Sequence, residues 1–217
     1  MGSIDLRQSP LSGWEARFAT ASSKSDCFDI RELRFTTQIN VRGDLSDPRF
    51  AHAAEEALGI ALPSLANTWA GREDCAALWL GPNEWLVAAS EGHHGRLYDA
   101  LVTCCSETLH SVTDVSASRA VIQIAGRHVR AVLAKGCSLD LHAATFAPLQ
   151  CAQSILAKAQ VILQCVDARP VLRLYVRSSV ADYLASWLLD AASETRASLD
   201  LDAERIANRL EGTLRTP

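Results

Sequence analysis

The chain has 217 residues, of which 48% are hydrophobic and 21% charged, and its formal net charge is −4 at pH 7. This composition is typical of a soluble globular protein with enough residues to bury a sizeable core. The sequence lacks the basic surplus of a nucleic-acid binder and any apolar run of about 18 residues that would span a membrane.

The first 30 residues are polar and rich in serine, and they show no sustained hydrophobic period. We therefore expect an extended N-terminal arm over residues 1–30. The opening MGSIDLRQSP lacks the cationic and apolar segments of a secretory signal peptide, which favours a cytoplasmic protein. Because thiols stay reduced in that compartment, we predict that the cysteines serve as small core residues: Cys27, Cys75, Cys104, Cys105, Cys137, Cys151 and Cys165.

Regular structure is predicted from residue 31 onward. Phe35, Thr37, Ile39 and Val41 alternate with other residues at the period of a strand that has one buried face. A helix follows, with Asp47 as its N-cap and a proline at its first position, where a missing N–H costs nothing. Its apolar stripe comprises Phe50, Ala53, Ala54 and Leu58.

The stretch LWLGPNEWLVAAS predicts an antiparallel hairpin that turns at Gly81–Glu84. In the simplest register Leu80 faces Trp85 and Trp79 faces Leu86. Both faces of the hairpin are then apolar. A helix layer covers only one of them, so the other face must lie on a second sheet or on a partner chain.

A helix over about 93–105 and a short strand in SVTDVS complete the first half, and the same pattern then starts again. Ala120, Ile122 and Ile124 mark a strand, and Gly136 is expected to end the next helix as its C-terminal cap. The apolar residues of that helix are Val129, Val132 and Leu133.

The last predicted elements are a strand in VLRLYVR and a helix with a capping-box-like start at Ser179 and Asp182. Residues 193–217 are charged and are interpreted as a surface tail. The stripe of the helix comprises Val180, Tyr183, Leu184, Trp187, Leu188 and Ala191.

Strand, helix, hairpin, helix and strand thus follow one another twice. This order predicts an α+β fold of two tandem split β-α-β (ferredoxin-like) repeats packed together. The domain is expected over residues 31–192, with halves of about 31–116 and 117–192. Two such halves can cover each other's second sheet faces, which accounts for the two-sided hairpin without a ligand.

Motifs that carry chemistry are missing from the sequence, which has no dinucleotide or phosphate loop, no nucleophile elbow and no C-x-x-C zinc pattern. His93 and His94 are interpreted as solvated residues at a helix start. His128 stands between Arg127 and Arg130 near another helix N-terminus, where two interpretations stay open, a phosphate site and a solvated face.

Two acids stand in distinctive motifs, Glu84 in the hairpin turn and Asp114 at the boundary between the halves. Together in one cleft they would form a paired-carboxylate site. Apart, they are a turn residue and a hydrogen-bonding cap, which is the interpretation we favour. The residues alone nominate no catalytic, cofactor-binding or metal-binding side chain.

Six segments stand in one order between about Arg7 and Ala192: ELRFTTQINVRGD, LGIALPSLANTW, LWLGPNEWLV, SVTDVSASRAVIQIAG, LAKGCSLDLH and RSSVADYLASWL. Together they resemble the gamma subunit family of heterotetrameric sarcosine oxidase, although we expect aspartate where Asn83 stands. A broader resemblance links TDVSASRAVIQIAGRHVRAVLAKGCSLDL to the folate-binding domain of aminomethyltransferases, with similar placement of Asp114, Ser116, Gly126 and Asp140.

The resemblance implies a non-catalytic gamma subunit that assembles and braces the large subunit. The complex would oxidatively demethylate sarcosine to glycine, with formation of hydrogen peroxide and of methylenetetrahydrofolate or formaldehyde. The implied partners are alpha, beta and delta subunits. FAD, FMN, NAD, zinc and tetrahydrofolate are implied on those subunits, and no cofactor on this chain. The alternatives are a stand-alone folate-binding or aminomethyl-transfer protein and a cysteine-dependent redox enzyme.

Overall fold

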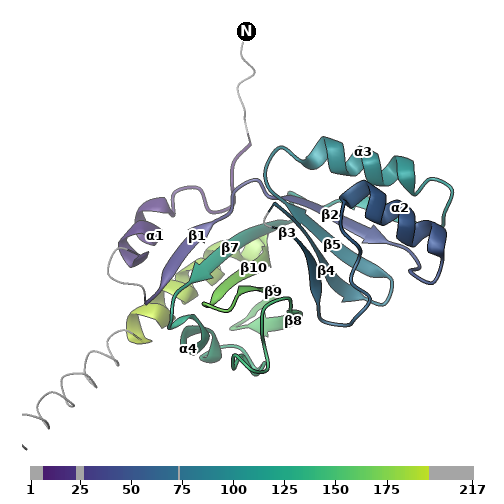
Figure 1. Ribbon diagram of the computed structural model, residues 1–217. Helices are drawn as coiled ribbons and strands as arrows, with labels where there is room; N and C mark the ends of the chain where they lie inside the picture. Colours follow the sequence, from purple (N-terminus) through teal and green to yellow (C-terminus); the bar gives the residue numbers. More distant parts are fainter. Residues whose placement is uncertain (1–6, 23–26, 73, 196–217) are drawn as a thin grey trace, which may run out of the picture.

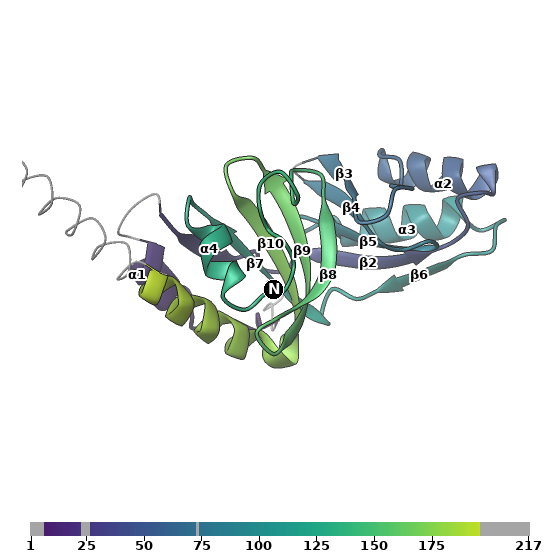
Figure 2. The same ribbon diagram turned by 90° about the horizontal axis from the view of Figure 1, so that it is seen from below.

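The computed structural model describes residues 7–22, 27–72 and 74–195, which contain two five-stranded antiparallel sheets (Figure 1). The first sheet has the order β3-β4-β5-β2-β6. Helices α2 and α3 lie together on one of its faces (Figures 1 and 2). The bounds are Thr37–Arg42 for β2, Pro48–Leu58 for α2, Trp69–Arg72 for β3, Cys75–Gly81 for β4, Glu84–Ala89 for β5, His94–Cys104 for α3 and Ser111–Asp114 for β6.

The second sheet has the order β1-β7-β10-β9-β8. Its outer face is covered by α1, α4 and a helix over residues 181–195. The bounds are Glu15–Ser22 for α1, Asp29–Glu32 for β1, Arg119–Ala125 for β7, Val129–Ala134 for α4, Cys151–Leu156 for β8, Ala159–Asp167 for β9 and Val171–Arg177 for β10; the 3-10 turn Ser178–Val180 leads into the last helix.

Helix α2 forms as its local sequence predicts. The Asp47 side chain accepts a hydrogen bond from the backbone N of Arg49, and Pro48 occupies the first turn. At the other end Gly59 adopts φ 69°, a left-handed conformation that favours glycine. The predicted stripe is buried at Phe50, Ala53, Ala54 and Leu58.

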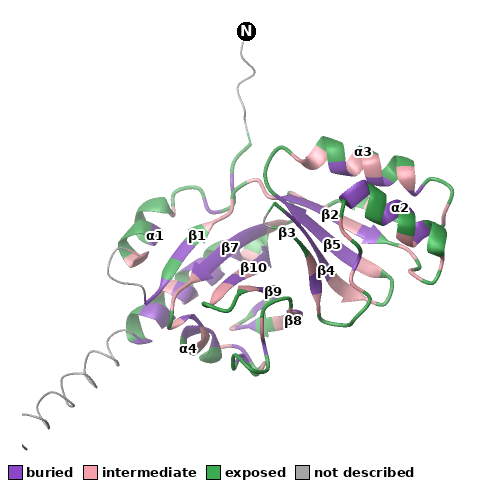
Figure 3. Cartoon of the chain, in the orientation of Figure 1, coloured by how far each residue is buried: buried purple, intermediate pink, exposed green. Residues whose placement is uncertain are grey.

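The first core lies between the first sheet and its helices, and the second core lies between the second sheet and its helices. The two sheets pack face to face through a third core. Leu78 and Leu86 of the hairpin meet Val121, Ile162 and Tyr175 of the second sheet. Figure 3 shows the buried residues concentrated on these strands and on the inward faces of the helices. The expectation that each half covers the second sheet face of the other is therefore confirmed for this region.

The hairpin register differs from the predicted one. Trp79 pairs with Trp85 and Leu78 with Leu86, with an irregularity between Trp79 and Gly81. One residue of β4 is therefore left without a partner, which shifts the pairing by one position and which alternation alone does not reveal. Trp85 is completely buried, and its indole Nε1 donates to the Pro63 carbonyl at 2.8 Å.

The extended arm expected over residues 1–30 is wrong for the part that the structure describes. Residues 15–22 form α1, Asp29–Glu32 form β1, and Leu11, Phe18 and Ile30 are buried in the second core. β1 pairs antiparallel with β7 at the edge of the second sheet. β6 holds the corresponding edge of the first sheet beside β2. We call β1 and β6 the closing strands.

Several local expectations are corrected. Helix α4 is capped by Lys135, and Gly136 instead lies against the Trp187 ring, where a Cβ would be 2.6 Å from Cζ2. Asp182 accepts a hydrogen bond from Trp14 Nε1 at 2.7 Å rather than capping its own helix. Tyr183 is 40% exposed. The tail expected over residues 193–217 lies outside the described residues from residue 196 onward.

Candidate functional site

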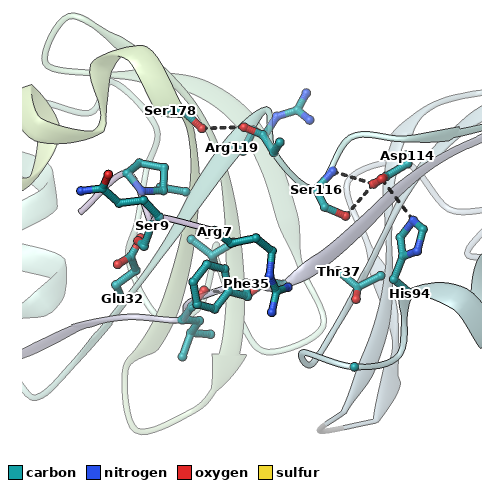
Figure 4. Close-up of a pocket in the computed structure, with 18 of the residues that line it drawn as sticks. Arg7, Ser9, Glu32, Phe35, Thr37, His94, Asp114, Ser116, Arg119 and Ser178 are labelled. Atoms are coloured by element: carbon teal, nitrogen blue, oxygen red, sulfur yellow. Dashed lines mark hydrogen bonds and ion pairs between the residues drawn. The ribbon is translucent and has the colours of Figure 1, made fainter. Parts of the chain in front are cut away.

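A cavity of about 830 Å³ lies between the two sheets, beside the N-terminal segment (Figure 4). Its lining comes from the residues before α1, from both closing strands and from the connection between β6 and β7. The packing of the two halves therefore leaves a cavity, whereas the sequence predicted only that their second sheet faces cover each other. Figure 4 labels Arg7, Ser9, Glu32, Phe35, Thr37, His94, Asp114, Ser116, Arg119 and Ser178.

Each closing strand ends on a carboxylate that lines this cavity, Asp114 on β6 and Glu32 on β1. Asp114 Oδ1 accepts hydrogen bonds from the Ser116 backbone N at 2.9 Å and the Ser116 hydroxyl at 2.6 Å. Its Oδ2 lies 3.1 Å from Nε2 of His94. The cap interpretation of Asp114 is therefore confirmed.

The surroundings lower the pKa of Asp114. Burial raises the pKa of this carboxyl, but the hydrogen bonds from Ser116 and the charge of His94 outweigh burial. Asp114 is thus an ionised acceptor. His94 was interpreted as solvated, yet it is half-buried, pairs with Asp114 and stacks on Tyr98 with ring centroids 5.5 Å apart.

Glu32 behaves in the opposite way. Its side chain is only 6% exposed, and burial raises its pKa, while hydrogen bonds from the Ser9 hydroxyl and the Leu11 backbone oppose the shift. The Ser9 hydroxyl donates to Oε1, and Arg34 Nε lies 3.7 Å from Oε2. Sequence reasoning missed Glu32 because DIRELRF matches no motif that carries chemistry, and its partner Ser9 lies 23 residues away along the chain.

The N-terminal segment forms one wall of the cavity. Arg7 places its guanidinium 4.5 Å from the centroid of the Phe35 ring and pairs with Glu91 at 2.8 Å. Phe35 was expected within the strand alternation, but it precedes β2 and has φ 49°, a left-handed conformation that is rare for an aromatic residue. This backbone bend turns the chain from one sheet into the other.

The structure does not bring the two sequence-nominated acids into one site. Glu84 accepts hydrogen bonds from Asn40 and Arg42 at 2.8 Å, and it faces Arg42 in the sheet register. Asp114 faces Ile39 on the other side of the same strand. The contacts of each acid are its own, so the paired-carboxylate alternative is not supported.

The arginines around His128 have partners within the protein. Arg127 donates to the Cys27 sulfur at 2.9 Å, and Arg130 donates to the Phe146 carbonyl at 3.0 Å. Their guanidinium groups tie α4 to neighbouring segments. These contacts do not favour the phosphate site, and the solvated face describes the exposed Arg127 but not the partly buried His128 and Arg130.

The cysteines are buried, apart from the partly exposed Cys104. Burial raises the pKa of the Cys151 thiol to about 11, against a smaller lowering by its hydrogen bond to Trp79, and burial also raises the pKa of Cys75. A reactive thiol has the opposite shift. In the described part of the chain, groups of three or more His, Cys, Asp or Glu arranged to hold a metal ion are absent.

Three serine hydroxyls of the cavity lining are bonded to carboxylates or to the backbone, as in Ser9 with Glu32, and these bonds include none to an imidazole. The Ser116 hydroxyl donates to Asp114 rather than to an imidazole, and the Ser178 hydroxyl donates to the Ala117 carbonyl at 2.9 Å. The cavity can receive polar groups beside an ionised carboxylate. That the chain carries no catalytic, cofactor-binding or metal-binding residue stays a prediction.

The architecture belongs to a known class of mixed α/β folds with two antiparallel sheets. Aminomethyltransferase T of the glycine cleavage system from Bartonella henselae superimposes with a TM-score of 0.59 at 14% identity, over 80% of this chain and 48% of that one. This likeness defines the fold alone.

The family is defined by closer relatives. The model of the sarcosine oxidase, gamma subunit family matches residues 42–194. The sarcosine oxidase subunit gamma of Corynebacterium sp. (strain U-96) is 33% identical over 198 residues, covering 90% of this chain and 95% of the relative, and that of Arthrobacter sp. is 33% identical over 195 residues, covering 88% of this chain and 93% of the relative. The chain therefore belongs to the sarcosine oxidase gamma subunit family.

A solved structure agrees with this assignment. In the heterotetrameric sarcosine oxidase from Corynebacterium sp. U-96 in complex with pyrrole 2-carboxylate, one chain superimposes with a TM-score of 0.81 at 33% identity. The match covers 87% of this chain and 96% of that one. The described residues include no helix that is both long and apolar enough to cross a membrane.

Proposed function

We propose that this chain works as the gamma subunit of a heterotetrameric sarcosine oxidase, where it assembles and braces the large subunit without carrying a reactive group. The observation that carries the proposal is the match over 96% of a chain from a solved heterotetramer, at 33% identity. A fold retained over that length supports the same place in a corresponding assembly.

The proposed partners are alpha, beta and delta subunits in the cytoplasm. The complex would oxidise sarcosine to glycine, reduce oxygen to hydrogen peroxide and transfer the one-carbon unit to tetrahydrofolate, or release it as formaldehyde. We place FAD, FMN, NAD, zinc and tetrahydrofolate on the other subunits. The burial of the cysteines, the raised pKa values of the Cys75 and Cys151 thiols and the hydrogen-bonded carboxylate of Asp114 support a structural role for this chain.

We also propose that each half is a split β-α-β unit of the ferredoxin-like type. In that unit the fourth strand lies beside the first, and the third lies between the first and the second. The order β6-β2-β5-β4 in one sheet and β1-β7-β10-β9 in the other supports this interpretation, with β3 and β8 as added edges. The N-terminal closing strand β1 would then serve as the fourth strand of the second unit.

Co-expression with its genomic neighbours tests the subunit role. An affinity tag on this chain should recover stoichiometric partner chains, and the recovered complex should oxidise sarcosine. A parallel preparation that lacks only this chain should yield a large subunit that aggregates or loses activity. If the remaining subunits form a stable, fully active enzyme without it, the proposed role is wrong.

A stand-alone folate-binding or aminomethyl-transfer protein is a second candidate, favoured by the cavity of about 830 Å³ between the sheets. Titration of the isolated chain with tetrahydrofolate separates the candidates. Saturable micromolar binding that Asp114→Asn weakens would support the second candidate, whereas absence of binding would leave the subunit role.

A further inference from the structure

Two arginines face each other where β7 begins and β10 ends. Arg119 and Arg177 are directly paired in the sheet register, and like charges in such a pair repel. Burial lowers the pKa of Arg119, and the charge of Arg177 acts in the same direction. Glu84 opposes this effect, but its oxygens are bonded to other residues. This arrangement is costly for an isolated chain.

Within the described ranges neither arginine makes an ion pair with a carboxylate. The hydrogen bond from the Arg119 guanidinium goes to the Ser118 hydroxyl at 3.4 Å, at the long limit of such contacts. Other arginines of this chain, such as Arg42 and Arg7, pair with glutamates at 2.8 Å. Arg177 is exposed and Arg119 is partly buried, so their guanidinium donors are accessible to a group outside the described residues.

Both arginines line a groove of about 330 Å³ on the inner face of the second sheet. Alternation along β10 puts Arg177 on the same face as Tyr175, which belongs to the core between the sheets. The first sheet covers this inner face of the second sheet where Tyr175 lies, before the end of β10. The lining includes Arg119, Arg177, Gln153, Gln160, Ile155 and Tyr175.

The groove also has an apolar rim on an edge strand. Ile155 of β8 is 56% exposed, although its neighbours along the strand include the fully buried Leu156. β8 is the edge strand of its sheet, and the backbone contacts on its outer side lie at its two ends, where Leu156 bridges Cys137 and the Cys151 N donates to the Asn67 carbonyl. An exposed aliphatic side chain beside two arginines that make no ion pair with a described carboxylate is typical of a protein interface, where arginine and apolar contacts gather.

We propose that this arginine groove docks an acidic segment of a partner subunit. The inference rests on the proposed subunit role and names its contact surface. Carboxylates from the partner would neutralise the paired charges of Arg119 and Arg177, and an apolar partner side chain would cover Ile155. A free small anion would leave Ile155 exposed, and a second copy of this acidic chain would add net repulsion at a net charge of −4.

Charge reversal in the co-expressed complex tests the proposal. Arg177→Glu should weaken the association of this chain with its partners at least about tenfold and lower the salt concentration at which they separate. The matched control is Arg169→Glu, which carries the same change of charge in the exposed turn between β9 and β10, at the far end of β10. Equal retention of the two variants would overturn the proposal.

Folding of the variant is checked separately. The carboxylate that Arg177→Glu introduces would face Arg119 in the register, so the isolated variant chain should melt at the same temperature as wild type or higher. Arg177→Gln removes the charge without adding an acid and should weaken association less. If association follows the melting temperature across these variants, the groove has no docking role.

A photo-crosslinking amino acid at Ile155 identifies the occupant. In the assembled complex it should form an adduct with a partner subunit at a peptide rich in Asp and Glu, whereas the same group at the 94% exposed Leu109 should not reach that peptide. An adduct with a second copy, or none, would refute the docking inference. If the tagged wild-type chain recovers no partner subunit at all, the proposed function itself fails. Failure of the docking inference alone would instead leave the wild-type complex intact.

Discussion

The two closing strands hold equivalent edges of their sheets but reach them in different ways. β6 follows α3 directly in the sequence and returns to the sheet that precedes it. β1 precedes the entire first half and pairs with β7, which follows that half. The comparison shows that the first sheet is complete within a continuous segment, whereas the second sheet depends on a long-range pairing that encloses the first.

The difference extends to burial and charge. Ile30 of β1 is 2% exposed in the second core, while β6 buries no residue completely and offers the partly buried Val112 to the first core. The terminal acid of β1 is buried and has a raised pKa, and that of β6 is half-exposed and has a lowered pKa. β1 therefore contributes through apolar burial, and β6 mainly through hydrogen bonds.

The largest expected effect falls on the core that lies beneath the first sheet. Trp85→Ala should reduce the free energy of unfolding by about 3–5 kcal/mol, because the indole is fully buried and packs near Phe50 with ring centroids 6.2 Å apart. Trp85→Phe, which keeps most of the apolar ring but loses the hydrogen bond to Pro63, should cost about 1–2 kcal/mol. Urea unfolding of the isolated chain measures both, and equal losses would contradict this account.

Shortening one apolar side chain in each closing strand tests the comparison of the two strands directly. Ile30→Ala should reduce the free energy of unfolding by about 2–4 kcal/mol. The matched change Val112→Ala in β6 should cost less than about 1.5 kcal/mol, because that side chain is only partly buried. Amide hydrogen exchange should show Ile30→Ala exposing β7 preferentially. A larger loss for Val112→Ala would reverse the assignment.

A smaller effect is expected where helices approach closely in the second half. Gly136→Ala would place a Cβ 2.6 Å from the Trp187 ring and should destabilise the chain by about 1–3 kcal/mol. Gly95→Ala, in helix α3 of the first half, meets no atom within 4 Å and should be neutral or stabilising by up to about 1 kcal/mol. Melting temperatures of the two variants should therefore shift in opposite directions or by clearly different amounts.

The smallest effect is a pair of opposite pH dependences. The pKa of Asp114 is lowered from 3.8, so its contribution is present above that value and is lost as pH falls through the lower native pKa. The pKa of Glu32 is raised from 4.5, so the native state loses stability as pH rises through 4.5 toward the higher native pKa.

Melting temperatures between about pH 3 and 7 check the pair. Asp114→Asn should lower stability near neutral pH, by less than about 1 kcal/mol because the carboxyl is half-exposed, and should remove part of the loss in acid. Glu32→Gln keeps an acceptor for Ser9 and should remove the loss on raising the pH. If both variants changed the profile in the same direction, the opposite pKa shifts would be wrong.

The sequence predicted the candidate site only in part. Asp114 was recognised as a cap because its partner Ser116 is two residues away, within reach of a local motif. Glu32 was missed because its partner Ser9 is far along the chain and because the expected arm concealed β1. The cavity itself, and the meeting of Arg119 with Arg177, follow from strand pairing between distant segments and have no local signal.

By itself the sequence determined the local elements and the family. Asp47 and Pro48 specify a helix start, alternation specifies the strands, and segments such as LWLGPNEWLV carry the resemblance, because each depends on residues a few positions apart. Only the tertiary structure decided the place of β1, the hairpin register and the lining of the cavity. These depend on which distant apolar faces bury one another most completely, and periodicity along the chain does not encode that choice.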